Sequence, residues 1–317
     1  ALSDRYKDFL SNNKTERRCV DTFVEISKEY GYRNLYEIVK KGEGLNPGDK
    51  VYVNNYGKSL CLFVLGTRPF EEGLRILGAH IDSPRLDLKQ NPLYEDTGLA
   101  MLKTHYYGGI KKYQWVAMPL AMHGVVVKSD GKVVDINIGD ELDDPVFGVS
   151  DLLIHLSKDQ MKKSLQDAFT GEDLNICIGS IPLKDNDEDN RVKANILEIL
   201  KEKYDIEEKD FVSAEIEVVP AGPARDFGLD RSMIMGYGHD DRVCAYTSFE
   251  AMMNIENPDK TCVTLLVDKE EIGSVGATGM HSRFFENALA EAMNAAGDYS
   301  DLKLRRALAN SNMLSSD

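Results

Sequence analysis

The stretch from Asp268 to Ser274, with the sequence Asp-Lys-Glu-Glu-Ile-Gly-Ser, constrains the fold of this chain more than any other segment. It directly follows the apolar run from Thr261 to Val267, which predicts a buried strand. A buried strand that ends in several carboxylates is costly unless a positive charge compensates them. A divalent metal ion is the usual compensator, so the sequence predicts a metal site where this strand ends.

A second segment, Gly78 to Pro84, contains a histidine and an aspartate two residues apart. The strand expected over Leu74–Ala79 delivers His80, and Asp82 shares its face. A neutral imidazole can bind metal through one nitrogen while Asp82 accepts the N–H of the other, which fixes the tautomer. Taken alone, the pattern also fits a histidine that is simply buried in the core.

A third segment, Gly238 to Arg242, contains two successive aspartates. The carboxylate of Asp240 can bridge two metal ions, and Arg242 can hold the neighbouring carboxylate of Asp241 or the wall of the site. Taken alone, Asp-Asp-Arg also fits a solvated turn or a helix N-cap.

The two glutamates after the buried strand complete the pattern. One of Glu270 and Glu271 can ligate metal while the other acts as general base on a metal-bound water. Asp317, in the Leu-Ser-Ser-Asp sequence at the end of the chain, is a fourth carboxylate. We expect the three segments that contain His80, Asp240 and the two glutamates at the carboxyl ends of strands, where open α/β sheets place their sites. One imidazole with carboxylates suits Zn²⁺, Mn²⁺ or Co²⁺.

Charge and cysteine content limit the partners. The formal net charge of −15 and the pI near 4.9 argue against a nucleic-acid or anionic-membrane surface. None of the five cysteines has C-x-x-C spacing, which argues against a disulfide scaffold or a thiolate zinc site and favours the reducing cytoplasm. We find no apolar run of 18 residues and no signal-peptide pattern.

The pattern of predicted helices and strands changes twice along the chain. Residues 1–91 and 236–317 read as an α/β domain, and residues 92–235 read as a β-rich insert. The helix expected over 191–203 should bury Val192, Ile196, Ile199 and Leu200. The stretch from Lys184 to Asn190 reads as a solvated loop, with a calcium loop as the alternative. Further helices are expected over 14–30, 35–40, 243–253, 282–294 and 302–310, and further strands over 51–53, 60–65, 124–128, 132–138 and 214–219.

The four segments together, Gly78–Pro84, Asp240–Arg242, Asp268–Ser274 and Ser315–Asp317, resemble in their order the motifs of the aspartyl aminopeptidase and vacuolar aminopeptidase I family. The resemblance covers essentially the whole chain. It implies a zinc-exopeptidase α/β/α catalytic domain interrupted by a β-rich dimerisation domain. It also implies two zinc ions per subunit, with cobalt or manganese as alternatives, and dimers that build a dodecamer.

The resemblance also implies a role for each site residue. His80 and Asp317 resemble ligands of the first zinc, Asp240 the bridging carboxylate and Glu271 a ligand of the second. Glu270 resembles the general base and Asp82 the orienting partner of His80. His155, within Ile-His-Leu, resembles an insert-domain residue that reaches the active site of a neighbouring subunit; a structural histidine is the alternative.

The family places a final histidine ligand downstream of the position matching Asp317, so we expect an incomplete second metal site in this chain. The function we expect is removal of the N-terminal residue from peptides with a free N-terminus. The sequence leaves open whether the removed N-terminal residue is acidic or is neutral or apolar. An acidic residue would need a cationic pocket, for which Lys111 and Lys112 are candidates. The alternatives are an inactive assembly subunit and a dinuclear-metal deacylase or carboxypeptidase.

Overall fold

The computed structural model describes residues 1–184 and 189–317, and its chain divides into two units. Unit 1 comprises Ala1–Ser83 and Ala224–Asp317, and unit 2 comprises Pro84–Pro223. Most of the expected acidic loop at 184–190 lies outside the described residues. Within the described part of the chain, no helix combines the length and the apolar character needed to span a bilayer.

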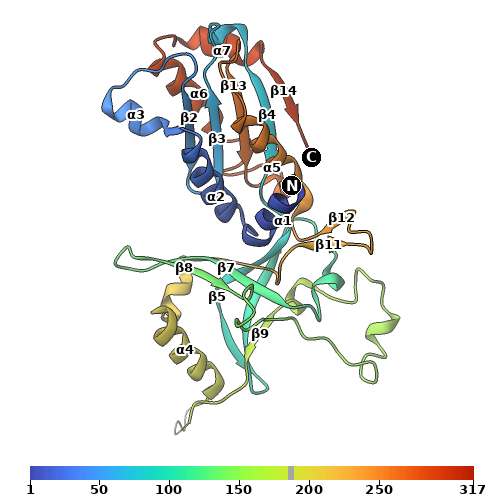
Figure 1. Cartoon of the computed structure of the whole chain (residues 1–317). Helices are drawn as coiled ribbons and strands as arrows, with labels where there is room; N and C mark the ends of the chain where they lie inside the picture. Colours follow the sequence, from blue (N-terminus) through green and yellow to red (C-terminus); the bar gives the residue numbers. More distant parts are fainter. Residues whose placement is uncertain (185–188) are drawn as a thin grey trace. The chain divides into compact units, whose positions relative to one another are not determined.

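Unit 1 is built on a mixed six-stranded sheet in the order β1-β2-β3-β13-β4-β14 (Figure 1). The strands are β1 (Arg33–Asn34), β2 (Lys50–Asn55), β3 (Ser59–Val64), β4 (Arg75–His80), β13 (Cys262–Val267) and β14 (Asn312–Ser315). Strand β4 runs parallel to both β13 and β14, so these three strands end at the same edge of the sheet. That edge is where His80 and the segment after Val267 meet.

Helices cover both faces of this sheet (Figure 1). One face packs on α1 (Leu2–Asn12), α2 (Glu16–Glu29) and α5 (His239–Met253), and the other on α3 (Leu35–Lys41), α6 (Phe284–Ala295) and α7 (Asp301–Ala309). Alternation along β3 explains the three layers: Leu60, Leu62 and Val64 join the first core, while Cys61 and Phe63 join the second. Every residue of β3 is buried, as expected of a strand covered on both faces.

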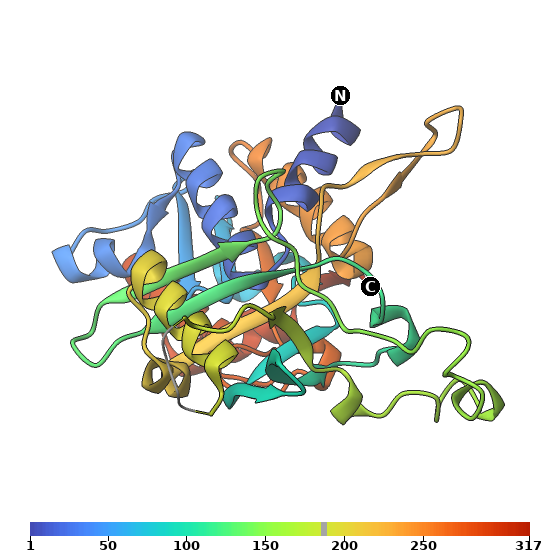
Figure 2. The same ribbon diagram turned by 90° about the horizontal axis from the view of Figure 1, so that it is seen from below.

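Unit 2 is built on a six-stranded antiparallel sheet in the order β8-β7-β10-β5-β6-β9. Its strands are β5 (Arg85–Asp96), β6 (Leu99–Tyr107), β7 (Leu120–Val127), β8 (Val133–Ile138), β9 (Ile176–Gly179) and β10 (Ala214–Pro220). Helix α4 (Arg191–Tyr204) contributes Val192 and Ile196 to the core of this unit. Figure 2 shows an irregular segment of unit 2, between β8 and β9, extending away from the strands.

Short 3₁₀ turns and one small hairpin connect these elements. The turns are Phe70–Glu72, Lys112–Trp115, Gln160–Lys162, Gly171–Asp173, Glu208–Ser213 and Glu270–Ile272. The hairpin pairs β11 (Arg225–Phe227) with β12 (Met233–Met235). It belongs to unit 1, and β5 belongs to unit 2, so the units divide somewhat earlier along the chain than the expected positions after residues 91 and 235.

The helices and strands expected from periodicity are present, with one error in burial. Val192 and Ile196 on α4 are buried, but Ile199 is 37% exposed and Leu200 is only partly buried. The reason is a cavity beside the C-terminal half of α4, which these two side chains line. Helical periodicity identifies the face turned toward the sheet, but it does not show how completely the surrounding elements cover that face.

Candidate metal centre

His80 is the last residue of β4 and lies opposite Val267 of β13 in the parallel register. Its imidazole is almost fully buried, and Nδ1 faces Asp82, at 3.0 Å from the backbone oxygen and 3.3 Å from Oδ1. The other ring nitrogen, Nε2, faces the carboxylate of Asp240 at 3.1 Å. One nitrogen is therefore held by Asp82, and the other faces the carboxylates where a metal ion would bind.

Asp82 connects two segments that are distant in the sequence. Its carboxylate is fully buried, and its two oxygens accept the backbone N–H groups of Glu270 and Glu271, each at 3.2 Å. The same carboxylate lies against His80. Asp82 thus fixes the imidazole and the turn that bears both glutamates with one side chain.

The Asp240–Asp241 segment begins α5 instead of ending a strand of the main sheet, so the expectation that all three segments follow strands is wrong here. The peptide bond between the two aspartates is cis. Asp240 is held by Ser83, whose hydroxyl donates to its backbone oxygen at 2.8 Å, and its side chain is 70% exposed. Asp241 is buried and accepts the backbone N–H of His80 at 3.3 Å.

Arg242 contacts backbone next to the site. Its guanidinium is buried and donates to two backbone oxygens, from Nε to Ile81 at 3.1 Å and from Nη2 to Lys14 at 2.9 Å. A Cβ on Gly238 would lie 2.1 Å from Nη1 of Arg242. The arginine therefore joins the start of α5 to the end of β4 and the start of α2, and glycine at 238 leaves room for it.

Four of the expected metal-binding and catalytic groups converge on the imidazole. One ligand atom each of His80, Asp240 and Glu271 lies within 4.8 Å of the other two. Nε2 of His80 is 3.8 Å from Oε2 of Glu270 and 3.8 Å from Oδ1 of Asp317. Asp317 reaches this position because it lies two residues beyond β14, next to β4 in the sheet.

The electrostatics of this cluster follow from carboxylates crowded around one imidazole. Burial alone would lower the pKa of His80, but the carboxylates of Asp82, Asp241 and Glu270 outweigh burial and raise this pKa to about 9. Burial, together with the neighbouring carboxylates, raises the pKa of Glu271 to about 7. Burial also raises the pKa of Asp241.

These residues fit a divalent metal ion. A nitrogen donor with oxygen donors is a common ligand set for zinc, and a carboxylate on the distal nitrogen of the histidine is the usual companion of such a site. The pKa of Glu271 is raised mainly by burial, and the carboxylates of Asp240, Asp82 and Glu270 add to the shift. A cation bound between His80, Asp240 and Glu271 would relieve the repulsion between these carboxylates.

Comparison with known proteins decides the family. Residues 9–317 match the family profile described as aminopeptidase I zinc metalloprotease (M18). The chain belongs to this family. Its activity is therefore that of an M18 aminopeptidase, a zinc metallopeptidase that hydrolyses peptide bonds.

Individual M18 relatives are similar over the whole chain. A probable M18 family aminopeptidase 1 from Clostridium acetobutylicum is 64% identical over 317 residues, which cover 100% of this chain and 68% of the relative. The corresponding protein from Thermotoga maritima is 46% identical over 318 residues, covering 100% of this chain and 68% of the relative. The chain thus corresponds to about two thirds of the length of these relatives.

Solved M18 structures have the same fold. A crystal structure of the M18 aminopeptidase from Thermotoga maritima matches with a TM-score of 0.93 at 45% identity, covering 99% of this chain and 68% of that one. Aminopeptidase I from Clostridium acetobutylicum matches with a TM-score of 0.90 at 60% identity and the same coverage. Yeast aminopeptidase 1 matches with a TM-score of 0.78, covering 100% of this chain and 71% of that one, and at 20% identity it shows the fold alone.

Some contributions to this M18 site were missed from the sequence. Ser83 stands within the Gly78–Pro84 motif, but its bond to the backbone of Asp240 was not expected, and Thr278, which donates to Asp268 at 2.6 Å, lies outside every motif. Asp241 was recognised only as a neighbour of Asp240 or Arg242. Its burial against the backbone of His80 depends on how α5 meets β4. His155, an expected substrate-binding residue, is exposed in unit 2.

Proposed function

We propose that the chain removes single residues from the N-terminus of peptides at a two-zinc centre, with cobalt or manganese as possible substitutes. His80 and Asp317 would be ligands of one ion, Glu271 one of the ligands of the other, and Asp240 would bridge them. The convergence of His80, Asp240 and Glu271 within 4.8 Å is the observation that carries this proposal. When bound, the ions polarise the scissile carbonyl, lower the pKa of a water molecule and anchor the free α-amine of the substrate.

Glu270 is proposed as the general base. Its carboxylate is 44% exposed, so a water molecule can reach it, and it lies 3.8 Å from the imidazole nitrogen that faces the site. Glu270 takes a proton from water as the water oxygen bonds to the carbonyl carbon. It then gives that proton to the amine nitrogen as the C–N bond breaks. The carboxylate of Asp82 accepts the backbone N–H of Glu270 and so keeps the turn that bears Glu270 in place during the proton transfers.

Replacing Glu270 by Gln tests the assignment, because glutamine has the same shape but cannot accept the proton. We expect hydrolysis of an aminoacyl-nitroanilide to fall by about 10²–10⁴-fold. The zinc content, measured by mass spectrometry of the purified protein, should stay near that of the unmodified protein. Glu256→Gln, at an exposed position outside the site, serves as the control. An E270Q protein with unreduced turnover would show that another group takes the proton.

A homo-oligomer is proposed from the exposed apolar surface of unit 2. Leu152, Leu153, Ile154 and Leu156 are all more than half exposed, in the irregular segment that extends from the sheet (Figure 2). A contiguous apolar run of this kind usually marks a contact with another protein chain. A solved structure of yeast aminopeptidase 1 is described as a dodecamer, and unit 2 is the proposed dimerisation domain.

Within that assembly, His155 is proposed to reach the active site of a neighbouring subunit. Replacing Ile154 and Leu156 by Lys should dissociate the assembly, which light scattering would detect, and should lower activity as well. His155→Ala should lower activity without dissociation. If His155→Ala leaves kcat/KM unchanged in an intact assembly, the histidine has only a structural role.

We also propose a cytoplasmic location without nucleic-acid or membrane partners. The five cysteines are all free, and three of them are buried, as expected of a protein folded in a reducing compartment. The acidic balance of charges supports the absence of a nucleic-acid surface. Fractionation of cells that express the gene at its natural level, followed by detection of the protein, would test the location.

A further inference from the structure

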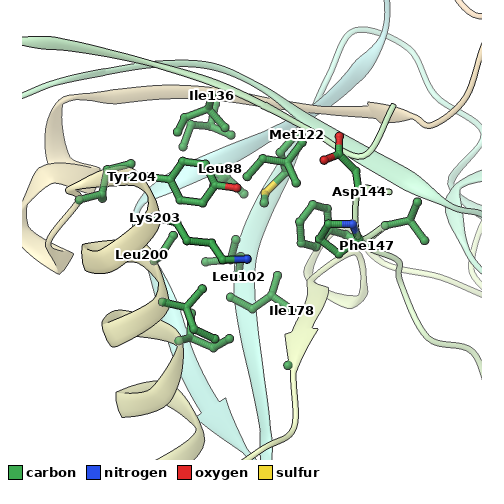
Figure 3. Close-up of a pocket in the computed structure, with 18 of the residues that line it drawn as sticks. Leu88, Leu102, Met122, Ile136, Asp144, Phe147, Ile178, Leu200, Lys203 and Tyr204 are labelled. Atoms are coloured by element: carbon green, nitrogen blue, oxygen red, sulfur yellow. The ribbon is translucent and has the colours of Figure 1, made fainter. Parts of the chain in front are cut away.

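Unit 2 contains a cavity of about 580 Å³ beside the C-terminal half of α4 (Figure 3). The cavity lies between that helix, one face of the sheet, and residues 143–147. Its volume is within the range of roughly 300–1,000 Å³ that is typical of sites for small molecules. It involves residues of unit 2 alone, so it is separate from the proposed metal centre.

The walls of this cavity are mainly apolar. The sheet contributes Leu102, Met122 and Ile136, and α4 contributes Ile199 and Leu200. Two of these side chains, Ile199 and Leu200, belong to the helix face that periodicity predicts to be buried, yet they remain partly open to solvent. An apolar occupant would complete the burial of that face.

Lys203 and Tyr204 line the cavity and can donate hydrogen bonds into it, beside the carboxylate of Asp144. Burial raises the pKa of Tyr204, and the nearby Asp144 carboxylate adds to this shift. Figure 3 shows the side chains of Lys203 and Tyr204 extending from α4 over the sheet. Among the described residues, the Tyr204 hydroxyl makes no hydrogen bond and the Lys203 ammonium makes no ion pair. Asp144 also lines the wall, but its Oδ2 already accepts the backbone N–H groups of Gly139 at 3.0 Å and Glu141 at 3.4 Å. The other charged wall residues, Asp143 and Lys203, are both exposed to solvent at the rim of the cavity.

We propose that this cavity binds an aliphatic carboxylate, such as a medium-chain fatty acid. The tail packs between the sheet residues and Leu200, and the carboxylate accepts hydrogen bonds from the Lys203 ammonium and the Tyr204 hydroxyl. An ammonium and a hydroxyl are complementary to a carboxylate head, and an apolar wall of this size is complementary to an alkyl tail. The site is independent of the peptidase reaction.

Calorimetric titration of the full chain with hexanoate, octanoate and decanoate tests the proposal. Each titration is carried out in excess acetate, which occupies any site, including a metal site, that binds a carboxylate without an alkyl tail. Affinity should rise about fourfold for each added methylene until the tail fills the cavity. An absence of saturable decanoate binding would overturn the proposal.

Variants then locate the bound molecule. Leu200→Trp, which fills the cavity from α4, should weaken decanoate binding at least tenfold. Glu198→Trp, an exposed position on the same helix outside the cavity wall, should not. Lys203→Met should weaken decanoate about tenfold but leave decanol unchanged, and Lys203→Arg should keep decanoate binding. Lys163→Met, an exposed lysine elsewhere in unit 2, controls for loss of charge.

A photoreactive decanoate analogue gives an answer that does not depend on whether a variant folds. Its label should appear on peptides from residues 191–204 or 143–147, and excess decanoate should suppress it. Labelling only outside these segments, equal binding of decanol and decanoate, or unchanged binding by the Leu200→Trp protein would each refute the assignment.

Discussion

Single side chains at this site serve several segments at once. Asp82 contacts the imidazole of His80 and accepts the backbone N–H groups of both Glu270 and Glu271. A carboxylate that accepts several N–H groups while buried is strongly constrained in position, because any movement leaves a buried donor without a partner. The geometry of the proposed ligands therefore depends on a residue that would not itself touch the metal.

Replacing Asp82 by Asn should lower zinc affinity by about 10- to 100-fold. The amide retains one acceptor oxygen, so one of the two glutamate N–H groups would face an NH₂ group, and the imidazole would lose its anionic partner. Competition with a zinc chelator measures the affinity. Asp135→Asn, at an exposed position in unit 2, is the matched control. Equal affinity of the D82N and unmodified proteins would argue against this positioning role.

Gly238→Ala should destabilise the chain more than an ordinary glycine substitution. Gly238 has a φ of 84°, and a Cβ there would lie 2.1 Å from Nη1 of Arg242. Gly42 has a φ of 69°, and a Cβ added there would have nothing within 4 Å, so Gly42→Ala should cost only the backbone term of about 1–2 kcal/mol. The clash at 238 should add about 1–3 kcal/mol in urea unfolding. Equal losses for both variants would mean that Arg242 moves aside freely.

At the scale of elements, the loop after β13 matters most. Two hydrogen bonds between Asp268 and Thr278 close the base of this loop. The Thr278 hydroxyl donates to the Asp268 carboxylate at 2.6 Å, and the Asp268 N–H donates to the Thr278 backbone oxygen at 3.3 Å. Ser59 at the start of β3 donates to the same Thr278 oxygen at 2.6 Å. Burial raises the pKa of Asp268, and the Glu16 carboxylate adds to this shift. The loop that bears both glutamates is therefore anchored to the sheet at its two ends.

Thr278→Val should destabilise the chain by about 1–3 kcal/mol, because it leaves the buried Asp268 carboxylate with one donor fewer. The same substitution at Thr264 gives a matched control within unit 1. Within the described residues, the buried hydroxyl of Thr264 has no hydrogen-bond partner, so Thr264→Val should be neutral or stabilising. Urea unfolding of both variants measures the difference. The anchoring role fails if both substitutions have the same effect, or if Thr278→Ser is as destabilising as Thr278→Val.

Most elements of this chain are predictable from local patterns, and the reasons are specific. The continuous apolar run at residues 60–65 predicts a buried strand, and the turn at 129–131 predicts a hairpin. Thr15 caps α2, and Gly42 ends α3 in a left-handed conformation, as short-range rules require. The exposure of Ile199 was not predictable from local patterns. Ile199 lines a cavity beside α4 whose wall also includes residues 143–147, which are far away in the sequence.

The chemistry of the site was more predictable than its supports. His80, Asp240 and Glu271 stand in short acidic or histidine motifs, and the structure brings them together. The sequence left two roles open for Arg242, and it does not show that the guanidinium donates to backbone oxygens of Ile81 and Lys14, because backbone acceptors have no sequence signature. The proposed ligands are thus visible in residue types, whereas the groups that position them depend on tertiary contacts.

At the scale of the whole molecule, the acidic cluster links metal binding to the stability of the chain. The net charge is −15, and the proposed site adds carboxylates that are close to one another. Without metal, His80 and Glu271 hold their protons up to a higher pH than usual, because neighbouring carboxylates raise the pKa of His80 and burial raises that of Glu271. Zinc requires these groups deprotonated, so metal and protons compete for the same place.

That competition predicts how stability depends on pH. The pKa of Glu271 is raised from 4.5 to about 7, and that of His80 from 6.5 to about 9. Between the ordinary and the raised pKa of each group, the folded chain holds more protons than the unfolded chain. The stability of the metal-free protein should therefore fall as pH rises from about 5 to about 9. Zinc should reverse this trend, because its affinity increases as both groups lose their protons. The rise in Tm on adding buffered zinc to the chelator-treated protein should therefore be larger at pH 8.5 than at pH 6. His80→Gln should remove the upper part of the decline, and a metal-free Tm that increases across this range would contradict the raised pKa values.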